Sequence, residues 1–287
     1  MKMSFVRVLT LCLMSAPITI PAAAEKRPQP DIEPSRLVVY KSVGKFELRL
    51  HVFEPAAPAA EARPAIVFFF GGGWVGGKPQ QFYPHCQYFA GRGAVAMAAE
   101  YRIRNKHLTT PYECVQDGKS AVRWIRAHAT ELGVDPGKII AGGGSAGGHV
   151  AACTALIHDL DEPGEDRTVR SKPNALLLFN PVVDTTRFGY GQKKLGKYPG
   201  NLSPVHHIGP GAPPTILFHG TADTTVPFEN VQRFCDRMIA CGNRCELVPF
   251  EGKVHGFFNY SRDVAAYDAT VAAADAFLVS LGLLPGP

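Results

Sequence analysis

A serine set between glycines constrains this chain more than any other feature. Residues 143–147 read Gly-Gly-Ser-Ala-Gly, the pattern G-x-S-x-G, with Ser145 at its centre. In a sharp strand-to-helix turn the serine takes a strained backbone conformation, and only small neighbours leave its hydroxyl clear. An apolar β-prone run at 138–141 precedes the pattern, and residues 148–156 follow with helix-compatible spacing. We therefore predict a strand, a tight turn and a helix, with Ser145 as a nucleophile. The alternative, Ser145 as an ordinary helix N-cap, would not require glycines on both sides.

A second glycine cluster follows another apolar run. Residues 65–70 form a candidate buried strand, and Gly71, Gly72, Gly73 and Trp74 come directly after it. Glycines in this position allow backbone N–H groups to face a developing oxyanion, which is the second component of an acyl-transfer site. The alternative interpretation is a flexible turn without a chemical role.

Ser145 needs a base, and the base needs a carboxylate, because a serine hydroxyl is a poor nucleophile at neutral pH. Asp223 lies just after a predicted strand at 215–219, and His255 lies just after one at 245–250. Both positions are carboxyl ends of strands, where the sites of parallel sheets form. The chain order Ser145, Asp223, His255 is that of the α/β-hydrolase triad. Asp184, at another strand end, is a rival acid, and Asp223 has the alternative of merely closing an Asx turn.

Residues 1–24 resemble a secretory signal peptide. Lys2 and Arg7 precede an apolar stretch at 8–20, and three alanines end the segment at Ala24. The apolar stretch is too short for a comfortable membrane span, and no later segment approaches one. We expect cleavage after Ala24 and a periplasmic or secreted protein without membrane insertion. The formal net charge of +5 falls to +3 when Lys2 and Arg7 are removed, and the remaining charges are interspersed, so no nucleic-acid partner is expected.

The cysteines do not indicate a metal site. Cys12 falls within the predicted signal peptide, and export would permit disulfides among the other six, with the pairing left open. Cys241 and Cys245 lack a second ligand pair, and the chain contains no H-E-x-x-H pattern. We expect no metal and no other cofactor.

Strands and helices alternate along residues 25–287, which predicts a single α/β domain. An antiparallel pair is expected at 36–53, turning near residues 42–44, and a turn at 134–136 is expected before the nucleophile strand. Alternation of this kind favours a mostly parallel sheet with helices on both faces, and the hairpin supplies an antiparallel edge. The remaining strands are predicted at 65–70, 94–99, 138–141, 175–180, 215–219 and 245–250, and the helices at 111–132, 148–156, 227–240 and 262–281.

Over residues 36–283 the sequence resembles the α/β-hydrolase superfamily, and within it the hormone-sensitive-lipase-like and acetylxylan/feruloyl-esterase-like serine esterases. The resemblance implies an oxyanion hole formed by the backbone N–H groups of Gly72, Gly73 and Ala146. One position departs from the pattern: Phe70 stands where many relatives carry histidine before the triple glycine. The motifs that carry the resemblance are Gly71-Gly72-Gly73-Trp74, Glu100-Tyr101-Arg102, Gly143-Gly144-Ser145-Ala146-Gly147-Gly148, His219-Gly220-Thr221-Ala222-Asp223 and His255-Gly256-Phe257.

The resemblance implies an exported serine carboxylesterase acting by a Ser-His-Asp acyl-enzyme mechanism. The segment at about 185–210 is too short for a large apolar lid, so we expect a short or absent cap. An open site suits acetyl-type or feruloyl esters of a small molecule or a polysaccharide. A prolyl-oligopeptidase-like serine peptidase is one alternative, although we expect such an enzyme to need several hundred more residues for its propeller. A non-catalytic α/β-hydrolase-type binding protein is another, although it would normally lack a member of the triad.

Overall fold

A computed structural model describes residues 26–57 and 61–286 of the chain. The predicted signal peptide at 1–24 lies outside these ranges. Within them, no helix combines the length and apolar character needed to cross a membrane. All six cysteines in the described part of the chain are free thiols.

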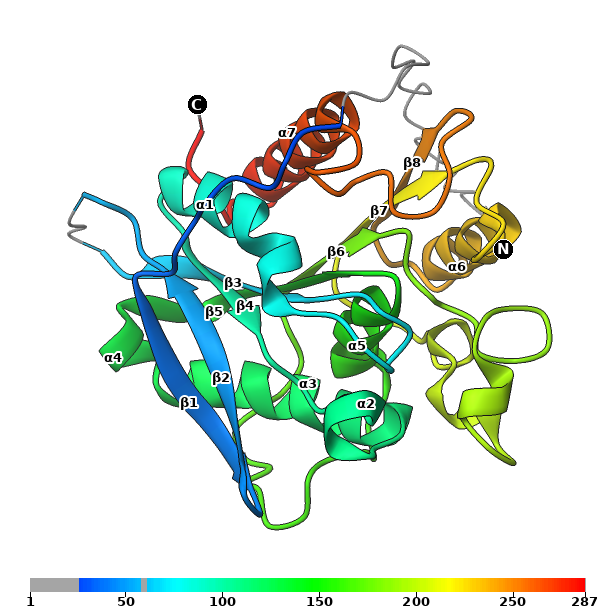
Figure 1. The fold of residues 1–287 in the computed structure, drawn as a ribbon, viewed down its shortest axis with the longest axis horizontal. Helices are drawn as coiled ribbons and strands as arrows, with labels where there is room; N and C mark the ends of the chain where they lie inside the picture. The colour runs from blue at the N-terminus through cyan, green and yellow to red at the C-terminus, as the bar shows by residue number, and fades with distance from the viewer. Residues whose placement is uncertain (1–25, 58–60, 287) are drawn as a thin grey trace, which may run out of the picture.

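Eight strands form one sheet in the spatial order β1-β2-β4-β3-β5-β6-β7-β8 (Figure 1). The hairpin β1–β2 pairs antiparallel with β4 through β2, and the six strands from β4 to β8 run parallel to one another. This is the predicted mostly parallel sheet with an antiparallel N-terminal edge. The strands are β1 Arg36–Val43, β2 Phe46–Phe53, β3 Arg63–Phe69, β4 Val95–Ala99, β5 Val134–Gly144, β6 Ala175–Phe179, β7 Thr215–Gly220 and β8 Cys245–Phe250.

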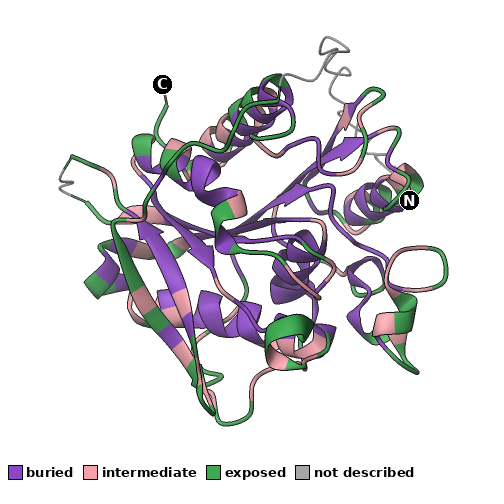
Figure 2. Cartoon of the chain, in the orientation of Figure 1, coloured by how far each residue is buried: buried purple, intermediate pink, exposed green. Residues whose placement is uncertain are grey.

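Each face of the sheet has its own apolar core, because side chains alternate along a strand. On β3, Val67 and Phe69 join the cluster beneath α3, α5 and α6, whereas Ile66 and Phe68 join the cluster beneath α1 and α7. Strands β6 and β7 are buried along their whole length, and β3 is buried from Ala65 onward (Figure 2). The helices are α1 Tyr83–Gly91, α2 Arg104–His107, α3 Pro111–Ala127, α4 Ala129–Leu132, α5 Ala146–Leu156, α6 Phe228–Ala240 and α7 Val264–Ser280.

Two element boundaries differ from the sequence prediction. The single helix expected at 111–132 is two helices, because the backbone leaves the helical region at His128 (φ −104°, ψ 24°) between α3 and α4. Strand β5 begins at Val134, where a turn was expected: Val134 already pairs with Arg63, and the register then shifts. A hydrogen bond typical of a turn is still present inside the strand: the N–H of Gly137 donates to the carboxylate of Asp135.

Helix α1 was absent from the predicted elements. Its sequence, Tyr-Pro-His-Cys-Gln-Tyr-Phe-Ala-Gly, is rich in aromatic residues and lacks a clear polar face. Residues such as Phe89 and His85 are buried where α1 meets β4 and α7. Burial in the tertiary structure therefore stabilises a segment whose own helix propensity is weak.

A cluster of buried charges joins β1, α3 and the segment at 158–166. We call it the ionic cluster. Lys41 Nζ lies 2.7 Å from Asp117 Oδ1, Arg102 Nη2 lies 2.6 Å from Glu162 Oε2, and Lys119 Nζ lies 2.9 Å from Asp161 Oδ1. Each cation therefore has a carboxylate partner at hydrogen-bonding distance. The members of the cluster are Lys41, Arg102, Lys119, Arg123, Asp117, Asp161, Glu162 and Glu165.

Candidate active site

Ser145 lies in the turn between β5 and α5 with a strained backbone (φ 54°, ψ −119°). Side chains on the flanking glycines would collide with backbone: a Cβ on Gly147 would meet the carbonyl groups of Phe69 and Phe70. The predicted strand, tight turn and helix are therefore present. Ser145 occupies the N-cap position of α5, but its side chain makes no capping hydrogen bond. Its hydroxyl is thus not used as a cap.

The structure brings the three predicted triad residues together. Ser145 Oγ lies 2.9 Å from His255 Nε2, and His255 Nδ1 lies 2.6 Å from Asp223 Oδ2. Since an ionised carboxylate only accepts, Nδ1 carries the proton that is donated to Asp223, and Nε2 is left to accept the hydroxyl proton of Ser145. The arrangement is that of a nucleophile, a general base and an orienting acid.

Asp223 is held in place by the turn that follows β7. Its Oδ1 accepts the N–H groups of Thr225 and Val226, both at 2.9 Å, which leaves Oδ2 for His255. Burial alone would raise the pKa of Asp223, but the hydrogen bonds from His255 and Val226 outweigh it, and the pKa lies below the ordinary value. His219 closes the turn through Nε2, which lies 2.9 Å from Val226 O.

The rival acid Asp184 has other partners. Its Oδ2 pairs with Arg233, and its Oδ1 accepts from the N–H (2.8 Å) and the hydroxyl (2.6 Å) of Thr186. Within the described residues, no hydrogen bond joins Asp184 to His255. Asp184 therefore closes a local turn after β6, while Asp223 orients the imidazole.

The glycine loop after β3 lies against the serine. A Cβ on Gly71 would come within 3.3 Å of Ser145 Cβ, and Gly72 (φ 131°) and Gly73 (φ 63°) have backbone conformations that favour glycine. The carbonyl of Gly72 accepts from two later N–H groups, but in the described structure the N–H groups of Gly72 and Gly73 have no acceptor. The N–H of Ala146, at the first position of α5, also lacks an intrahelical acceptor. These are the three predicted oxyanion donors, and their catalytic role stays a prediction.

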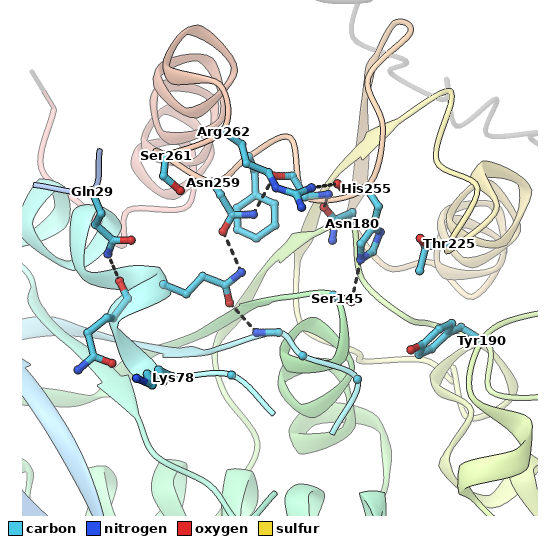
Figure 3. A pocket seen from close by; sticks show the side chains of 18 residues that line it. Gln29, Lys78, Ser145, Asn180, Tyr190, Thr225, His255, Asn259, Ser261 and Arg262 are labelled. Carbon is cyan, nitrogen blue, oxygen red and sulfur yellow. Dashed lines mark hydrogen bonds between the residues drawn. The ribbon is translucent and has the colours of Figure 1, made fainter. Parts of the chain in front are cut away.

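A polar chain that sequence reasoning missed links this loop to the histidine (Figure 3). Gly71 N donates to Gln81 Oε1 (2.6 Å), Gln81 Nε2 donates to Asn259 Oδ1 (2.8 Å), and Asn259 Nδ2 donates to Gly256 O (2.7 Å). We call these contacts the Gln81 bridge. Gly256 N donates in turn to the buried Asn180 (2.9 Å). Gln81 and Asn259 are 178 positions apart and match no motif.

Phe70 explains why another residue supports the loop. Phe70 stands at the position where histidine was expected from the family resemblance. Its ring stacks on that of Tyr101, with the ring centroids 4.2 Å apart. Tyr101 also donates its hydroxyl to Phe70 O (2.6 Å). The Phe70 side chain therefore packs in the core, and Gln81 supplies the polar contact to the glycine loop.

The triad opens into a cavity of about 650 Å³ that is lined by both polar and apolar groups. Among the described residues, no group of three or more histidine, cysteine, aspartate or glutamate side chains is arranged to hold a metal ion. The lining includes Gln29, Lys78, Gln80, Gln81, Ser145, Asn180, Tyr190, Thr225, His255, Phe258, Asn259, Ser261 and Arg262, together with glycines of the loop after β3.

Comparison with known proteins places this geometry in a family. The family model described as BD-FAE matches residues 50–199, slightly more than half of the chain. The chain belongs to the BD-FAE family. The model of the prolyl oligopeptidase family matches residues 181–278 of this BD-FAE protein, which include Asp223 and His255.

Similar proteins are esterases. Esterase 2 of Thermogutta terrifontis is 54% identical, with a TM-score of 0.86 over 91% of this chain and 100% of that one. The carboxylesterase NlhH of Mycobacterium tuberculosis is 27% identical over 92% of both chains. The probable carboxylic ester hydrolase LipM of the same organism is 31% identical over 61% of this chain and 44% of LipM. The alignments with the first curated relatives span only about half of those proteins' length.

These findings confirm the predicted fold class and superfamily. The BD-FAE protein has an α/β-hydrolase fold, its site has the geometry of a serine hydrolase, and the proteins that it resembles are carboxylic ester hydrolases. The acyl group, the alcohol and the cellular location are matters for proposal.

Proposed function

We propose that this BD-FAE protein is an exported serine carboxylesterase that removes short acyl groups, acetyl-type or feruloyl, from carbohydrate. The observation that carries the proposal is the continuous hydrogen-bonded path from Asp223 through His255 to Ser145 Oγ, which opens into a cavity whose lining includes several polar side chains. The path supplies an activated nucleophile, and the cavity supplies partners for hydroxyl groups of a sugar.

The chemistry follows from the positions of the protons. His255 Nε2 accepts the proton of Ser145 as Oγ attacks the ester carbonyl, and Asp223 stabilises the imidazolium that results. The oxyanion develops beside the free N–H groups of Gly72, Gly73 and Ala146. His255 then protonates the leaving alcohol. Water, deprotonated by the same nitrogen, attacks the acyl carbonyl, and the acid leaves as His255 returns the proton to Ser145 Oγ.

Short acyl groups fit the surroundings of the triad. The segment at 185–210 contains only three short 3₁₀ helices, Gln192–Lys194, Pro199–Leu202 and Pro204–His206. A long acyl chain would stay partly in water and gain little of the roughly 0.8 kcal/mol that burial of each methylene offers. Solved structures of the Thermogutta esterase hold propionate and butyrate, which are short acids of this kind.

An acyl-length series tests the proposal. Acetyl to butyryl p-nitrophenyl esters should be hydrolysed much faster than decanoyl esters, acetylated xylan or a feruloylated sugar should be turned over, and chelators should have no effect. Preference for emulsified long-chain lipid would contradict the carbohydrate-esterase assignment. Peptide substrates belong in the same panel, since the prolyl oligopeptidase match makes a serine peptidase the second candidate. Turnover of peptides but not esters would favour it.

The proposed export rests on residues 1–24 alone. After cell fractionation, the protein outside the cytoplasm should begin near Glu25 when its N-terminus is sequenced. Full-length protein confined to the cytosol would contradict export and leave the esterase proposal standing.

A further inference from the structure

Cations line the hollows around the candidate active site, whereas the carboxylate of Asp223 is buried behind His255 and does not line the cavity. Lys78 and Arg262 line the cavity, and among residues 26–57 and 61–286 no aspartate or glutamate does. A second hollow of about 410 Å³ adjoins it at Gly73. Its lining contains Arg104, Lys193 and Lys194, again with no acid from the described ranges. Lining of a single sign makes the potential in such hollows positive and attracts anions.

These charges are not neutralised by neighbouring side chains. In the described structure none of the five cations has a carboxylate oxygen within 4.0 Å. Lys194 Nζ donates to Gly73 O (3.2 Å) and to the Tyr190 hydroxyl (3.0 Å), and Arg262 Nη1 donates to His255 O (2.6 Å). All three acceptors are neutral, so the positive charge remains available to a ligand.

The proton path indicates which part of an ester meets Arg262. His255 Nε2 protonates the leaving alcohol, so the alcohol lies on the His255 side of Ser145. Figure 3 shows Arg262 beside His255, with Asn259 next to Arg262. A guanidinium has five N–H donors in a fork that matches a carboxylate, and the contact with His255 O uses the donors of one nitrogen only.

We propose that the alcohol part of the substrate carries a carboxylate, as a uronic acid residue does, and that Arg262 binds it. Lys78 lines the same cavity, and together with the three cations of the second hollow it strengthens the attraction. The inference rests on the proposed function and narrows its substrate class from carbohydrate esters to acidic ones.

A matched pair of substrates tests the proposal. The O-acetyl ester of a hexuronate and that of the corresponding hexuronamide differ in charge and hardly in shape. A second pair, 4-acetoxybenzoate and 4-acetoxybenzamide, needs no sugar site, and each rate is normalised to hydrolysis by hydroxide. At low salt the wild type should prefer the anionic member of each pair by about tenfold in kcat/KM, and the preference should shrink as salt rises. Esters with the carboxylate on the acyl side, such as a hemisuccinate against its succinamate, share the general attraction but not the contact with Arg262, so they should show a clearly smaller preference.

Variants assign the preference to a residue. Arg262→Gln should abolish most of the anionic-to-neutral ratio, and Lys78→Gln should lower it less. Arg167→Gln removes the same charge from an exposed position that lines a different hollow, and it should leave the ratio unchanged. The readout is the ratio of kcat/KM for the anionic and the neutral substrate. An effect of the substitution on His255 changes both values by the same factor and therefore cancels.

The outcomes separate this inference from the proposed function. Equal rates for both members of each pair, or a preference that survives Arg262→Gln, would overturn the anion site while leaving an esterase. Failure to hydrolyse any ester, p-nitrophenyl acetate included, would overturn the proposed function. The anion site is then decided by calorimetry on Ser145→Ala protein, which should bind hexuronate more tightly than hexuronamide, and equal binding would refute it.

Discussion

Two charged regions of this molecule differ in whether their cations have carboxylate partners. In the ionic cluster every cation has a carboxylate at hydrogen-bonding distance, and the side chains of Lys41 and Arg102 are 7% and 8% exposed. Around the candidate active site five cations have none, and the N–H groups of Gly72 and Gly73 also lack acceptors in the described structure. Paired groups hold one segment to another, whereas unpaired groups are available to a substrate.

The two acids at neighbouring strand ends repeat this contrast. Asp184 and Asp223 each accept backbone N–H groups in a short turn. Asp184 is then neutralised by Arg233, while Asp223 receives the imidazole of His255. The same residue type in the same local turn is structural in one place and suited to catalysis in the other, and its partner makes the difference.

The largest expected effect concerns the candidate active site, whose polar groups are available to a substrate. Ser145→Ala should reduce kcat by about 10⁴-fold or more, because the nucleophile is lost while the fold is kept. Ester hydrolysis and thermal unfolding are measured together, with Ser280→Ala at the end of α7 as the control. A variant that kept a tenth of the wild-type turnover would rule out Ser145 as the nucleophile.

The two acids provide the next test. Asp223→Asn should lower kcat by about 10³ to 10⁴-fold, because an amide no longer holds the imidazole in the required tautomer. Asp184→Asn should leave kcat near the wild-type value, since its contacts lie with Arg233 and Thr186. Steady-state kinetics on both variants gives the ranking, and the reverse ranking would move the acid to Asp184.

The ionic cluster, in which the charges are paired, is expected to affect the stability of the fold. Asp117→Asn leaves Lys41 and Arg102 with Glu162 as their one remaining shared carboxylate. Breaking a buried pair completely costs about 3 to 5 kcal/mol, so the expected loss is at or below the lower end of that range. Denaturant unfolding should show this loss, while kcat of the folded protein is unchanged. Glu47→Gln breaks an exposed pair with Arg49 and should cost less than about 1 kcal/mol. Equal losses would show that the ionic cluster is not stabilising.

His85 is a buried polar residue outside the candidate active site, and its lack of hydrogen-bond partners in the described structure predicts a pH dependence of the stability of the fold. Both ring nitrogens are buried without a partner among the described residues, and burial lowers the pKa to about 3. The unfolded chain takes up a proton below pH 6.5 and the folded protein does not until about pH 3, so stability is lost as the pH falls through this window. Wild type should lose roughly 1.4 kcal/mol per pH unit more than His85→Leu between pH 6 and 4. Parallel unfolding curves for the two proteins across that range would contradict the assignment.

The smallest expected effect concerns the Gln81 bridge. Gln81→Leu should lower kcat by about tenfold with little change in KM, because the glycine loop and His255 lose their connection while the cavity keeps its shape. Gln232→Leu, on the exposed face of α6, is the control. If the bridge acts as a unit, the double variant Gln81→Leu with Asn259→Leu should be little worse than Gln81→Leu. Additive losses would show that the two side chains act independently.

Local patterns in the sequence determined the elements that carry the site. Glycines around Ser145 predict a tight turn, and a Cβ on Gly143 or Gly147 would indeed meet backbone. Apolar runs followed by polar or glycine residues predict buried strands with functional groups at their ends. These signals lie within a few positions of the residue concerned. The order Ser145, Asp223, His255 could therefore be proposed from the chain alone.

The tertiary structure decided what depends on contacts between distant residues. Arg233 neutralises Asp184 across 49 positions, Gln81 meets Asn259 across 178, and α1 is stabilised by burial against β4 and α7. The cations of the two hollows come from segments as far apart as Lys78 and Arg262. No local pattern encodes such neighbours, because the free energy of these contacts arises only when the folded sheet brings separate loops to the same edge.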